Sequence, residues 1–441
     1  LRYDLATAIR TDANTLWGYD PAINATRAND PPAPANKLDV APRFGFAYQL
    51  TSKTVLRGGY GVAFFPQFKG LGGFFASPPV QIGRAFPVTD PLKPAFTLRD
   101  SFGAFVYNPV QGIPGNPNLV MGMFNPSSSK SPYVQSWSLT IERQLAERVV
   151  VRAAYVGNKG THLEDIIQIN QLFGSQLGPD SRFGGLTAQQ RRPFPLAGQV
   201  QQFANDMNSN YHSLQLSVDW LSWKGLSMLS SFTRGKAIAE NRSYKQDNWN
   251  RAASRGLGNA DLPRAFVQSA TYELPFGAGR KWMNHTGLVN QFIGGWQVNG
   301  ILTARDGFPI HITSSSNLSG SFSILQFPDR LRDGNLPEGS RTIQRWFDTS
   351  AFKIPDAYTF GNSGAFPGVR GPGLVNLDFS LFKRFRVMEG KNLEFRAESF
   401  NISNTPGFAN PNAAIGTAAA GSISALLNAN RSIQFALKFL F

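Results

Sequence analysis

The last nine residues of the chain carry the pattern that most restricts its fold. Apolar side chains occupy every second position up to the final residue, at Ile433, Phe435, Leu437, Phe439 and Phe441. Successive side chains of a β-strand point to opposite faces of the sheet, so one face of this strand is wholly apolar. The intervening positions, Gln434 to Leu440, form a mixed face. A soluble protein would rarely leave such an apolar edge strand bare.

The same alternation recurs along the whole chain. In residues 133–145 the aromatic and aliphatic side chains alternate with Ser, Thr, Glu and Gln. Similar segments lie at residues 44–50, 56–64, 149–155, 213–220, 226–232, 266–274, 296–304, 375–381 and 393–398. We count about twelve strands, each near the ~9–11 residues that a tilted membrane crossing needs.

The expected connections alternate between short and long. Short turns are predicted at residues 51–53, 145–148, 221–225 and 388–391, and long gaps at 66–131, 160–208, 237–261, 313–372 and 403–429. Bacterial barrels have short periplasmic turns and long extracellular loops. Structureless loops beyond about 12–15 residues are uncommon in a compact soluble domain. The sequence therefore predicts an all-β fold, a transmembrane antiparallel β-barrel in the outer membrane, rather than a soluble sandwich.

Aromatic residues favour the same setting. Phe occurs 36 times, and six aromatics near predicted strand ends are candidates for the membrane-interface girdles of a barrel. They are Tyr133, Trp137, Tyr155, Trp220, Trp223 and Trp296. No run approaches the ~18 consecutive apolar residues of a membrane-spanning helix.

The charge is strongly basic but dispersed. The formal net charge is +15, yet no block of like charges forms, so we expect solvated loops and a basic lumen and no nucleic-acid partner. The absence of Cys excludes disulfides and thiol chemistry.

Three short segments contain glycine, histidine or acidic residues of the kinds that can form metal or phosphate sites. His162, Glu164 and Asp165 follow an expected turn at Gly157–Gly160, where a solvated loop is favoured over a metal site. Gly58–Gly61 lies inside an alternating strand, so close packing is favoured over a phosphate loop. Gly368–Gly373 is expected to form a turn before a strand.

Longer stretches resemble one family. Residues 41–65 (APRFGFAYQL, then TVLRGGYGVAFF), 131–163, 210–238, 346–355, 361–385 and 393–408 are similar, in order, to segments of TonB-dependent outer-membrane receptors of the Oar-like subgroup. The final RSIQFALKFLF resembles the family's closing strand. The resemblance implies a carboxypeptidase-regulatory-like sandwich and a plug domain, followed by a plugged barrel of 22 strands.

The chain shows neither of the first two parts. We therefore expect residues 1–441 to be a single C-terminal part of the barrel, a fragment holding about twelve of a probable 22 strands and no plug domain. The first residues, Leu1 to Asp4, look like a strand already under way, so we expect further chain and an export signal upstream. A partial barrel has two unpaired edges, and an open curved sheet or a small strained ring is expected.

The resemblance implies energised uptake of an unidentified ligand bound at the extracellular loops. TonB would act through the missing N-terminal part, and the barrel would contact outer-membrane lipid and lipopolysaccharide. The barrel-assembly machinery would read a C-terminal signal, which we assign to Ile433, Phe435, Leu437, Phe439 and Phe441. We expect no enzyme activity, no cofactor and no metal.

Two alternatives stay open. One is a passive outer-membrane porin of about twelve strands, complete in itself. The other is a surface adhesion or secretion-related barrel, in which long loops bind a partner and nothing is transported. An outer-membrane hydrolase is disfavoured, because no nucleophile-elbow sequence is present.

Overall fold

The computed structural model describes residues 2–6, 17–20, 25–28, 36–65, 120–124, 130–241, 245–388 and 390–441. One large sheet dominates, in the order β21-β19-β18-β14-β13-β11-β10-β9-β8-β6-β5. Its strands are β5 (Arg43–Thr51), β6 (Thr54–Phe64), β8 (Tyr133–Ala146), β9 (Val149–Gln168), β10 (Gln199–Trp223), β11 (Leu226–Glu240), β13 (Arg264–Glu273), β14 (Trp296–Arg305), β18 (Leu374–Met388), β19 (Lys391–Phe400) and β21 (Ser432–Leu440).

Smaller elements lie around this sheet. β7 (Val120–Phe124) pairs with β10, and β12 (Arg255–Leu257) with β11. Four two-stranded pairs are β1 (Arg2–Ala6) with β4 (Asn36–Ala41), β2 (Trp17–Asp20) with β3 (Ala25–Ala28), β15 (Thr313–Ser314) with β20 (Ala414–Ile415), and β16 (Asp329–Arg330) with β17 (Phe352–Lys353). The α-helices are α2 (Arg251–Ser254) and α3 (Leu288–Ile293). Among the described residues, no helix is long and apolar enough to cross a membrane.

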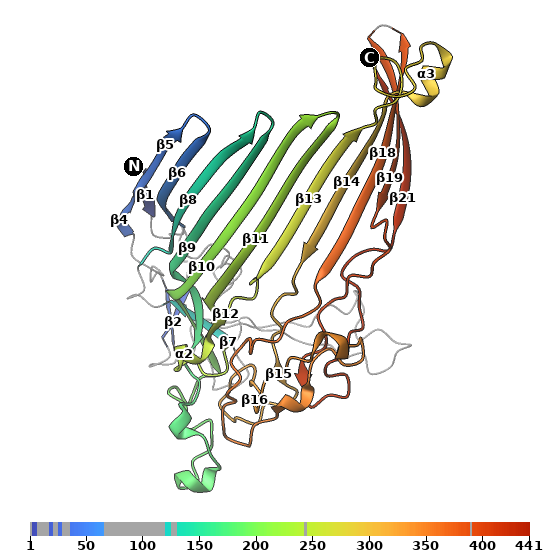
Figure 1. Ribbon diagram of the computed structural model, residues 1–441. Coiled ribbons are helices and arrows are strands. Elements are labelled where there is room, and N and C mark those ends of the chain that lie inside the picture. The colour runs from blue at the N-terminus through green and yellow to red at the C-terminus, as the bar shows by residue number, and fades with distance from the viewer. Residues whose placement is uncertain are drawn as a thin grey trace, which may run out of the picture.

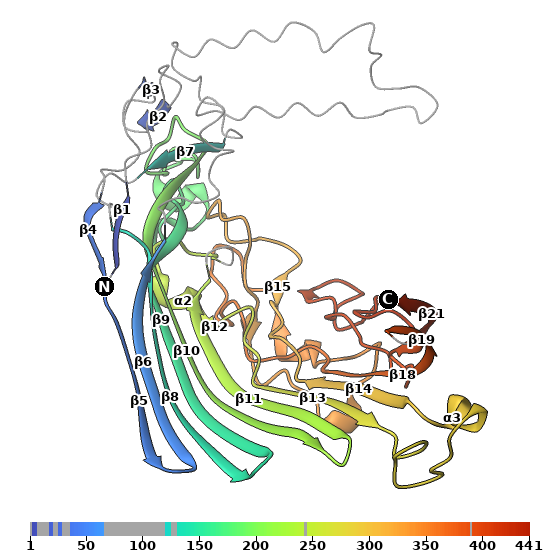
Figure 2. The ribbon, with the colours of Figure 1, turned by 90° about the horizontal axis from the view of Figure 1, so that it is seen from above.

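The sheet is bent into an open arc (Figure 2), and its successive strands pair antiparallel. Within the described residues, β5 and β21 form its two edges. The expectation of an open curved sheet is confirmed, and a compact two-sheet sandwich is excluded.

The strand ends differ in their connections. At one end β5–β6, β8–β9, β10–β11 and β18–β19 are joined by turns of about two residues, as predicted. We call this the turn end; it lies at the top of Figure 1, and the long connections lie at the other, the loop end. One connection breaks the rule, because residues 274–295 form a long segment at the turn end that contains α3.

Two strands are much longer than predicted. β9 has 20 residues and β10 has 25, and they stay paired as far as Gln168 and Gln201. The predicted gap at 160–208 therefore shrinks to residues 169–198, and Gly157–Gly160 lies inside β9 rather than in a turn. This extension packs against loops on both of its faces, so its side chains do not alternate between apolar and polar. Strands are predicted from that alternation, and the extension is therefore not included.

The two faces of the sheet differ in chemistry. A row of paired positions on one face runs through Leu216, Phe232, Phe266, Ala304 and Val375, across five strands. On the same face at the edges, Phe44 and Phe435 are 67% and 71% exposed. An apolar surface of this extent is stable only against lipid or another apolar surface.

The opposite face carries a ladder of ion pairs. Glu142 of β8 pairs with Arg57 of β6 at 3.6 Å and with Arg152 of β9 at 2.7 Å, and Arg152 also pairs with Asp219 of β10. Farther along the sheet, Glu394 pairs with Arg384 and Arg396. Such a polar wall is suited to a hydrated or protein-filled lumen.

Two glycines lie beneath aromatic rings of neighbouring strands on the apolar face. A Cβ added to Gly58 would lie 2.3 Å from the ring of Phe46, and one added to Gly157 would lie 2.5 Å from the ring of Trp137. Both glycines lie within strands, so the close-packing interpretation of Gly58–Gly61 is confirmed.

The position of β21 at the sheet edge generates a prediction about assembly. Replacing Phe439 and Phe441 by Asp, or deleting Phe441, should prevent assembly of the intact protein, because charge then replaces the apolar face that lipid and the assembly machinery meet. The measurement is heat-modifiable mobility of the protein in isolated outer membranes.

The matched control is the pair Gln434→Asp and Lys438→Asp, on the other face of the same strand. We expect this variant to assemble. Normal assembly of the Phe439 and Phe441 variant would contradict the signal assignment.

Candidate functional site

The loop end forms a folded unit, which we call the loop assembly. It comprises the far parts of β9 and β10, residues 169–198 between them, and residues 245–261, 306–373 and 401–431. Figures 1 and 2 show these segments gathered at one end of the sheet, and over its concave side in projection. A hydrophobic cluster joins the last two segments, with Ile310, Ile312, Phe347, Ala351, Phe352, Val369 and Ile415 all buried.

Buried amides hold the loops to one another. The Gln246 Oε1 accepts hydrogen bonds from the backbone N–H of Phe327 at 3.0 Å and of Gly361 at 3.1 Å. The Gln171 Oε1 accepts from the backbone N–H of Asn248 at 2.8 Å, and its Nε2 donates to the Gln246 carbonyl at 2.6 Å. One loop is thus fixed to two others by side chains that satisfy backbone groups away from water.

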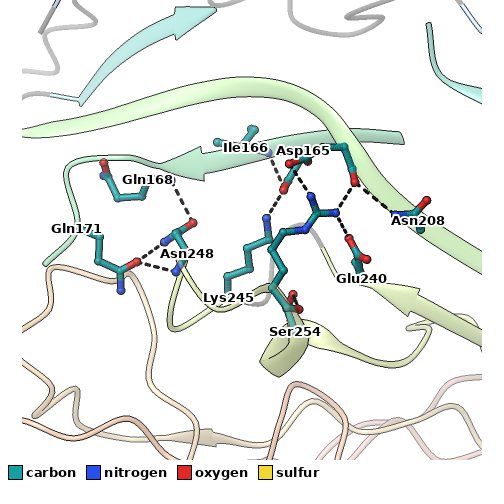
Figure 3. Close-up of polar contacts among 11 residues, drawn as sticks. Asp165, Ile166, Gln168, Gln171, Asn208, Glu240, Lys245, Asn248 and Ser254 are labelled. Atoms are coloured by element: carbon teal, nitrogen blue, oxygen red, sulfur yellow. Dashed lines mark hydrogen bonds and ion pairs between the residues drawn. The ribbon is translucent and has the colours of Figure 1, made fainter. Parts of the chain in front are cut away.

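An ion pair joins strand β9 to the segment that follows β11 (Figure 3). The Lys245 Nζ donates to a carboxylate oxygen of Asp165, and the two side chains are 7% and 2% exposed. Burial raises the pKa of the Asp165 carboxyl, and the Lys245 ammonium opposes this shift. Nearby, Arg251 pairs with Asp206 at 2.9 Å and with Glu240 at 2.5 Å.

A cavity of about 170 Å³ adjoins this ion pair. Its lining combines one ammonium, several amides and two aliphatic side chains: Ile166, Gln168, Gln199, Gln201, Lys245, Asn248 and Ile324. This volume is below the ~300–1,000 Å³ of sites for drug-sized ligands. The cavity therefore suits a small polar group, such as one end of a larger ligand.

This arrangement corrects one interpretation of the sequence. Glu164 and Asp165 lie in strand β9 and not in a solvated loop, and Asp165 is buried. No group of three or more His, Cys, Asp or Glu side chains able to hold a metal occurs among the described residues. No sequence pattern indicates Lys245 and Gln246, because their partners are about 80 residues away or more along the chain.

The predicted girdle aromatics fall into two groups. Trp137 and Tyr155 lie toward the loop end, where the Tyr155 hydroxyl contacts His212 Nδ1 at 2.7 Å. Trp220, Trp223 and Trp296 lie at the turn end. His212 and Trp220 are separated on β10 by about 27 Å of strand at ~3.4 Å per residue. At the ~35–45° tilt of barrel strands this is roughly 19–22 Å across the membrane, somewhat less than the ~25 Å apolar band. Tyr133 starts β8 at the loop end. The girdle assignment stays a prediction.

The predicted C-terminal signal residues lie together on β21 and at its end. Ile433, Phe435, Leu437 and Phe439 share the apolar face, paired in register with Ser399, Ala397, Phe395 and Leu393 of β19. Phe441 follows the strand and stacks on Phe439 with ring centroids 6.0 Å apart. Their role as a signal also stays a prediction.

Comparison with known families settles the class. The family model described as "Outer membrane beta barrel domain" matches residues 1–434. The chain belongs to this family. It is therefore an integral outer-membrane protein, its apolar face is the lipid face, and the turn end is the periplasmic end.

Solved structures of outer-membrane barrel proteins are similar to this barrel chain at low identity. The outer membrane transporter YddB from Escherichia coli is 10% identical, with a TM-score of 0.48 over 91% of this chain and 40% of that one. The ferripyoverdine receptor of Pseudomonas aeruginosa is 9% identical, with a TM-score of 0.44 over 94% and 34%. BauA, the ferric preacinetobactin receptor from Acinetobacter baumannii, is 11% identical, with a TM-score of 0.43 over 94% and 38%. The chain thus spans about two fifths of their lengths or less. No curated protein matches it.

The buried ion pair generates a prediction. Lys245→Met should loosen the loop assembly by about 3–5 kcal/mol, because it leaves a buried carboxylate without its partner. The combined Asp165→Leu and Lys245→Met variant should lose less. Hydrogen exchange of residues 245–261 in the folded barrel measures both effects.

The control is Lys353→Met. Lys353 pairs with Asp356 at 3.1 Å, but the two side chains are 49% and 81% exposed, so this change should cost ~0–1 kcal/mol. Equal effects at Lys245 and Lys353 would contradict the structural role of the buried pair.

A second prediction concerns pH. His311 lies between the rings of Phe327 and Phe366, and burial lowers its pKa to about 4. The folded state therefore binds the proton less readily than the unfolded state, so His311 causes a loss of stability as pH falls from about 6.5 toward 4. Between pH 7.5 and pH 5 we expect a loss on the order of 1–2 kcal/mol in the loop assembly.

Hydrogen exchange of residues 306–373, corrected for its intrinsic pH dependence, measures this loss. The His311→Gln variant should remove most of the pH dependence, whereas His285→Gln, an exposed change at the turn end, should leave it unchanged. An unaltered pH profile in His311→Gln would show that another group is responsible.

Proposed function

We propose that this chain is the C-terminal barrel part of a TonB-dependent outer-membrane receptor of the Oar-like subgroup. The full protein would take up a ligand bound at the loop assembly, using force transmitted by TonB. The ordered series of motifs from residues 41–65 to the final strand supports the subgroup assignment.

The observation that carries the proposal is the open sheet. Within the part of the chain that the structure describes, strands β5 and β21 each present an unpaired edge, and lipid offers no hydrogen-bond partner for backbone groups. Further strands are needed to close the ring. A 22-stranded barrel with a plugged lumen supplies them, and eleven strands are about half of it.

The remaining parts of the receptor then have defined places. Residues 1–441 form a single part of the barrel, and the plug and the regulatory-like sandwich lie elsewhere in the full protein. TonB would contact that N-terminal part. The polar wall with Glu142 and Arg152 would face the plug, and lipopolysaccharide would meet the lipid face at the loop end.

The loop assembly supports a ligand-binding role. Its segments are fixed by a hydrophobic cluster and buried amides, so its outer surface is preorganised before any ligand arrives. The ligand class is unidentified, and the cavity beside Lys245 is the place where we expect one of its polar groups to lie.

The same rigidity favours one alternative function, surface adhesion. A preorganised loop assembly could bind a partner without any transport. Binding of the purified periplasmic domain of TonB to the full-length protein separates the two functions. We expect a complex for a receptor and none for an adhesin.

A disulfide experiment tests the larger ring, and residues 1–441 contain no Cys that could interfere with it. Ala436→Cys combined with Arg396→Cys should form a disulfide in outer membranes, because these positions pair directly in β21 and β19. Ala436→Cys combined with single cysteines along β5 should form none, because other strands separate β5 from β21.

A disulfide between β5 and β21 would mean that the chain closes as a small ring, and would favour the porin. The absence of that disulfide, together with no TonB binding, would keep the large barrel and contradict uptake. The two parts of the proposal can therefore fail separately.

A further inference from the structure

The long connection at the turn end is an element of its own. Residues 274–295 contain α3, which lies beside the upper ends of β18 and β19 in Figure 1 and outside the arc of the sheet in Figure 2. The other turns at this end have about two residues, so a segment of this length is not needed to reverse the chain.

The segment is fixed to the lipid face of the wall. Lys383 of β18 is only 1% exposed, and its Nζ donates to the carbonyls of Phe292 and Gly294 at the C-terminal end of α3. The Trp296 Nε1 donates to the same Phe292 carbonyl at 2.9 Å. A cation at a helix C-terminus is favourable because that end carries partial negative charge.

The inside of the segment is also closely packed. The Asn290 Oδ1 accepts a hydrogen bond from the Ala278 N–H at 2.7 Å. Gly277 has φ of 102°, and a Cβ there would lie 2.5 Å from the Cα of Gly294. The two ends of the segment thus meet in a contact that only glycine permits, so α3 is held in one position.

The outer side of this segment is apolar and uncovered. Leu288 and Phe292, one helical turn apart, are 81% and 73% exposed, and Val289, Trp282 and Met283 are about half exposed. Large apolar side chains gathered in this way on a rigid element mark an interaction surface.

The charges around the surface are mainly basic. Arg280 and Lys281 lie within the segment, and Lys224 and Lys391 lie in or beside the two turns that flank it. The described acidic groups beside the segment are Glu273, which pairs with Arg280 at 2.7 Å, and Glu394, which pairs with Arg384 and Arg396 on the lumen face. Apolar side chains beside basic ones are the composition of elements that lie in the interface of an anionic membrane.

We propose that residues 275–295 form a membrane foot, which inserts Leu288, Val289 and Phe292 into the periplasmic leaflet among anionic phospholipids. Family membership fixes the turn end as periplasmic, so the inference does not depend on TonB or on a ligand. The foot lies on the lipid side of the wall, continuous with Trp296 and Phe385, whose rings lie 5.2 and 5.0 Å from Lys383 Nζ. This position favours lipid over a second protein.

The experiment uses single cysteines introduced into residues 1–441, which contain no Cys, in the full-length protein with any Cys elsewhere replaced by Ser; each is labelled with an environment-sensitive fluorophore. The protein is reconstituted in phosphatidylcholine vesicles that contain phosphatidylglycerol. The vesicles also contain a lipid that carries a nitroxide quencher at a shallow depth in the bilayer. The label at Leu288→Cys should be quenched several-fold more than labels at Ser340→Cys in the loop assembly and Lys391→Cys in a neighbouring turn, which are exposed to water. Phe435→Cys on the lipid face is the positive control.

A variant tests the apolar contact itself. Phe292→Asp in the Leu288→Cys background should reduce quenching to the level of the Lys391→Cys label, while heat-modifiable mobility shows an intact barrel. Removing phosphatidylglycerol should also weaken quenching, because the basic residues then lose their partners.

Two results would overturn the foot. One is a Leu288→Cys label as accessible to water and as little quenched as the Ser340→Cys label. The other is a label shielded from both water and lipid that cross-links to a second copy, which would make the surface a protein interface.

Discussion

The need to pair every backbone hydrogen-bonding group in lipid, where no water is available, determines how the strands of this structure are arranged. Each strand that crosses lipid must satisfy its N–H and C=O groups on neighbouring strands, because hydrocarbon offers no partner. The unbroken order from β5 to β21 is the result, and it fixes which residues face outward. A shift of one residue in any pairing would send an apolar row into the lumen and ionised groups into lipid. The ion pairs of Glu142 and Glu394 and the apolar row through Phe232 thus depend on the same register.

The two ends of the sheet respond to this constraint differently. At the turn end the chain reverses within about two residues at every described hairpin except the one formed by residues 274–295, and these tight turns keep strands in register. At the loop end the backbone is free of lipid, and long segments fold around their own apolar cluster, with Ile312 and Phe347 fully buried. Gln246 and Lys245 can then be buried, because each of these two side chains has a protein partner to satisfy it. Buried polar and charged side chains, which would be unfavourable on the lipid face of the sheet, are therefore concentrated in the loops.

The features that could be predicted from the sequence are those set by the periodicity of residues close together in the chain. The alternation at residues 375–381 and 433–441 and the tight turns follow from spacing within one strand or one hairpin. The open sheet is expected from the resemblance to a larger barrel. The full lengths of β9 and β10, α3 with its contact to Lys383, and the Asp165–Lys245 pair do not follow from such spacing. These features depend on contacts between segments tens of residues apart. Where such contacts bury side chains on both sides of a strand, the alternating pattern is absent. The girdle and signal assignments depend on lipid and on assembly factors.

The glycines under aromatic rings have a consequence for how this wall can vary. Gly157 and Trp137 lie on adjacent strands, and the ring fills the space that a side chain at Gly157 would need. Neither position is free to change alone: a larger residue at 157 collides with the indole, and a smaller residue at 137 uncovers backbone to lipid. Gly58 and Phe46 form a second pair of this kind. Substitutions at the two positions of such a pair are therefore coupled. A large side chain on one strand can be exchanged for one on the neighbouring strand only when both positions change together.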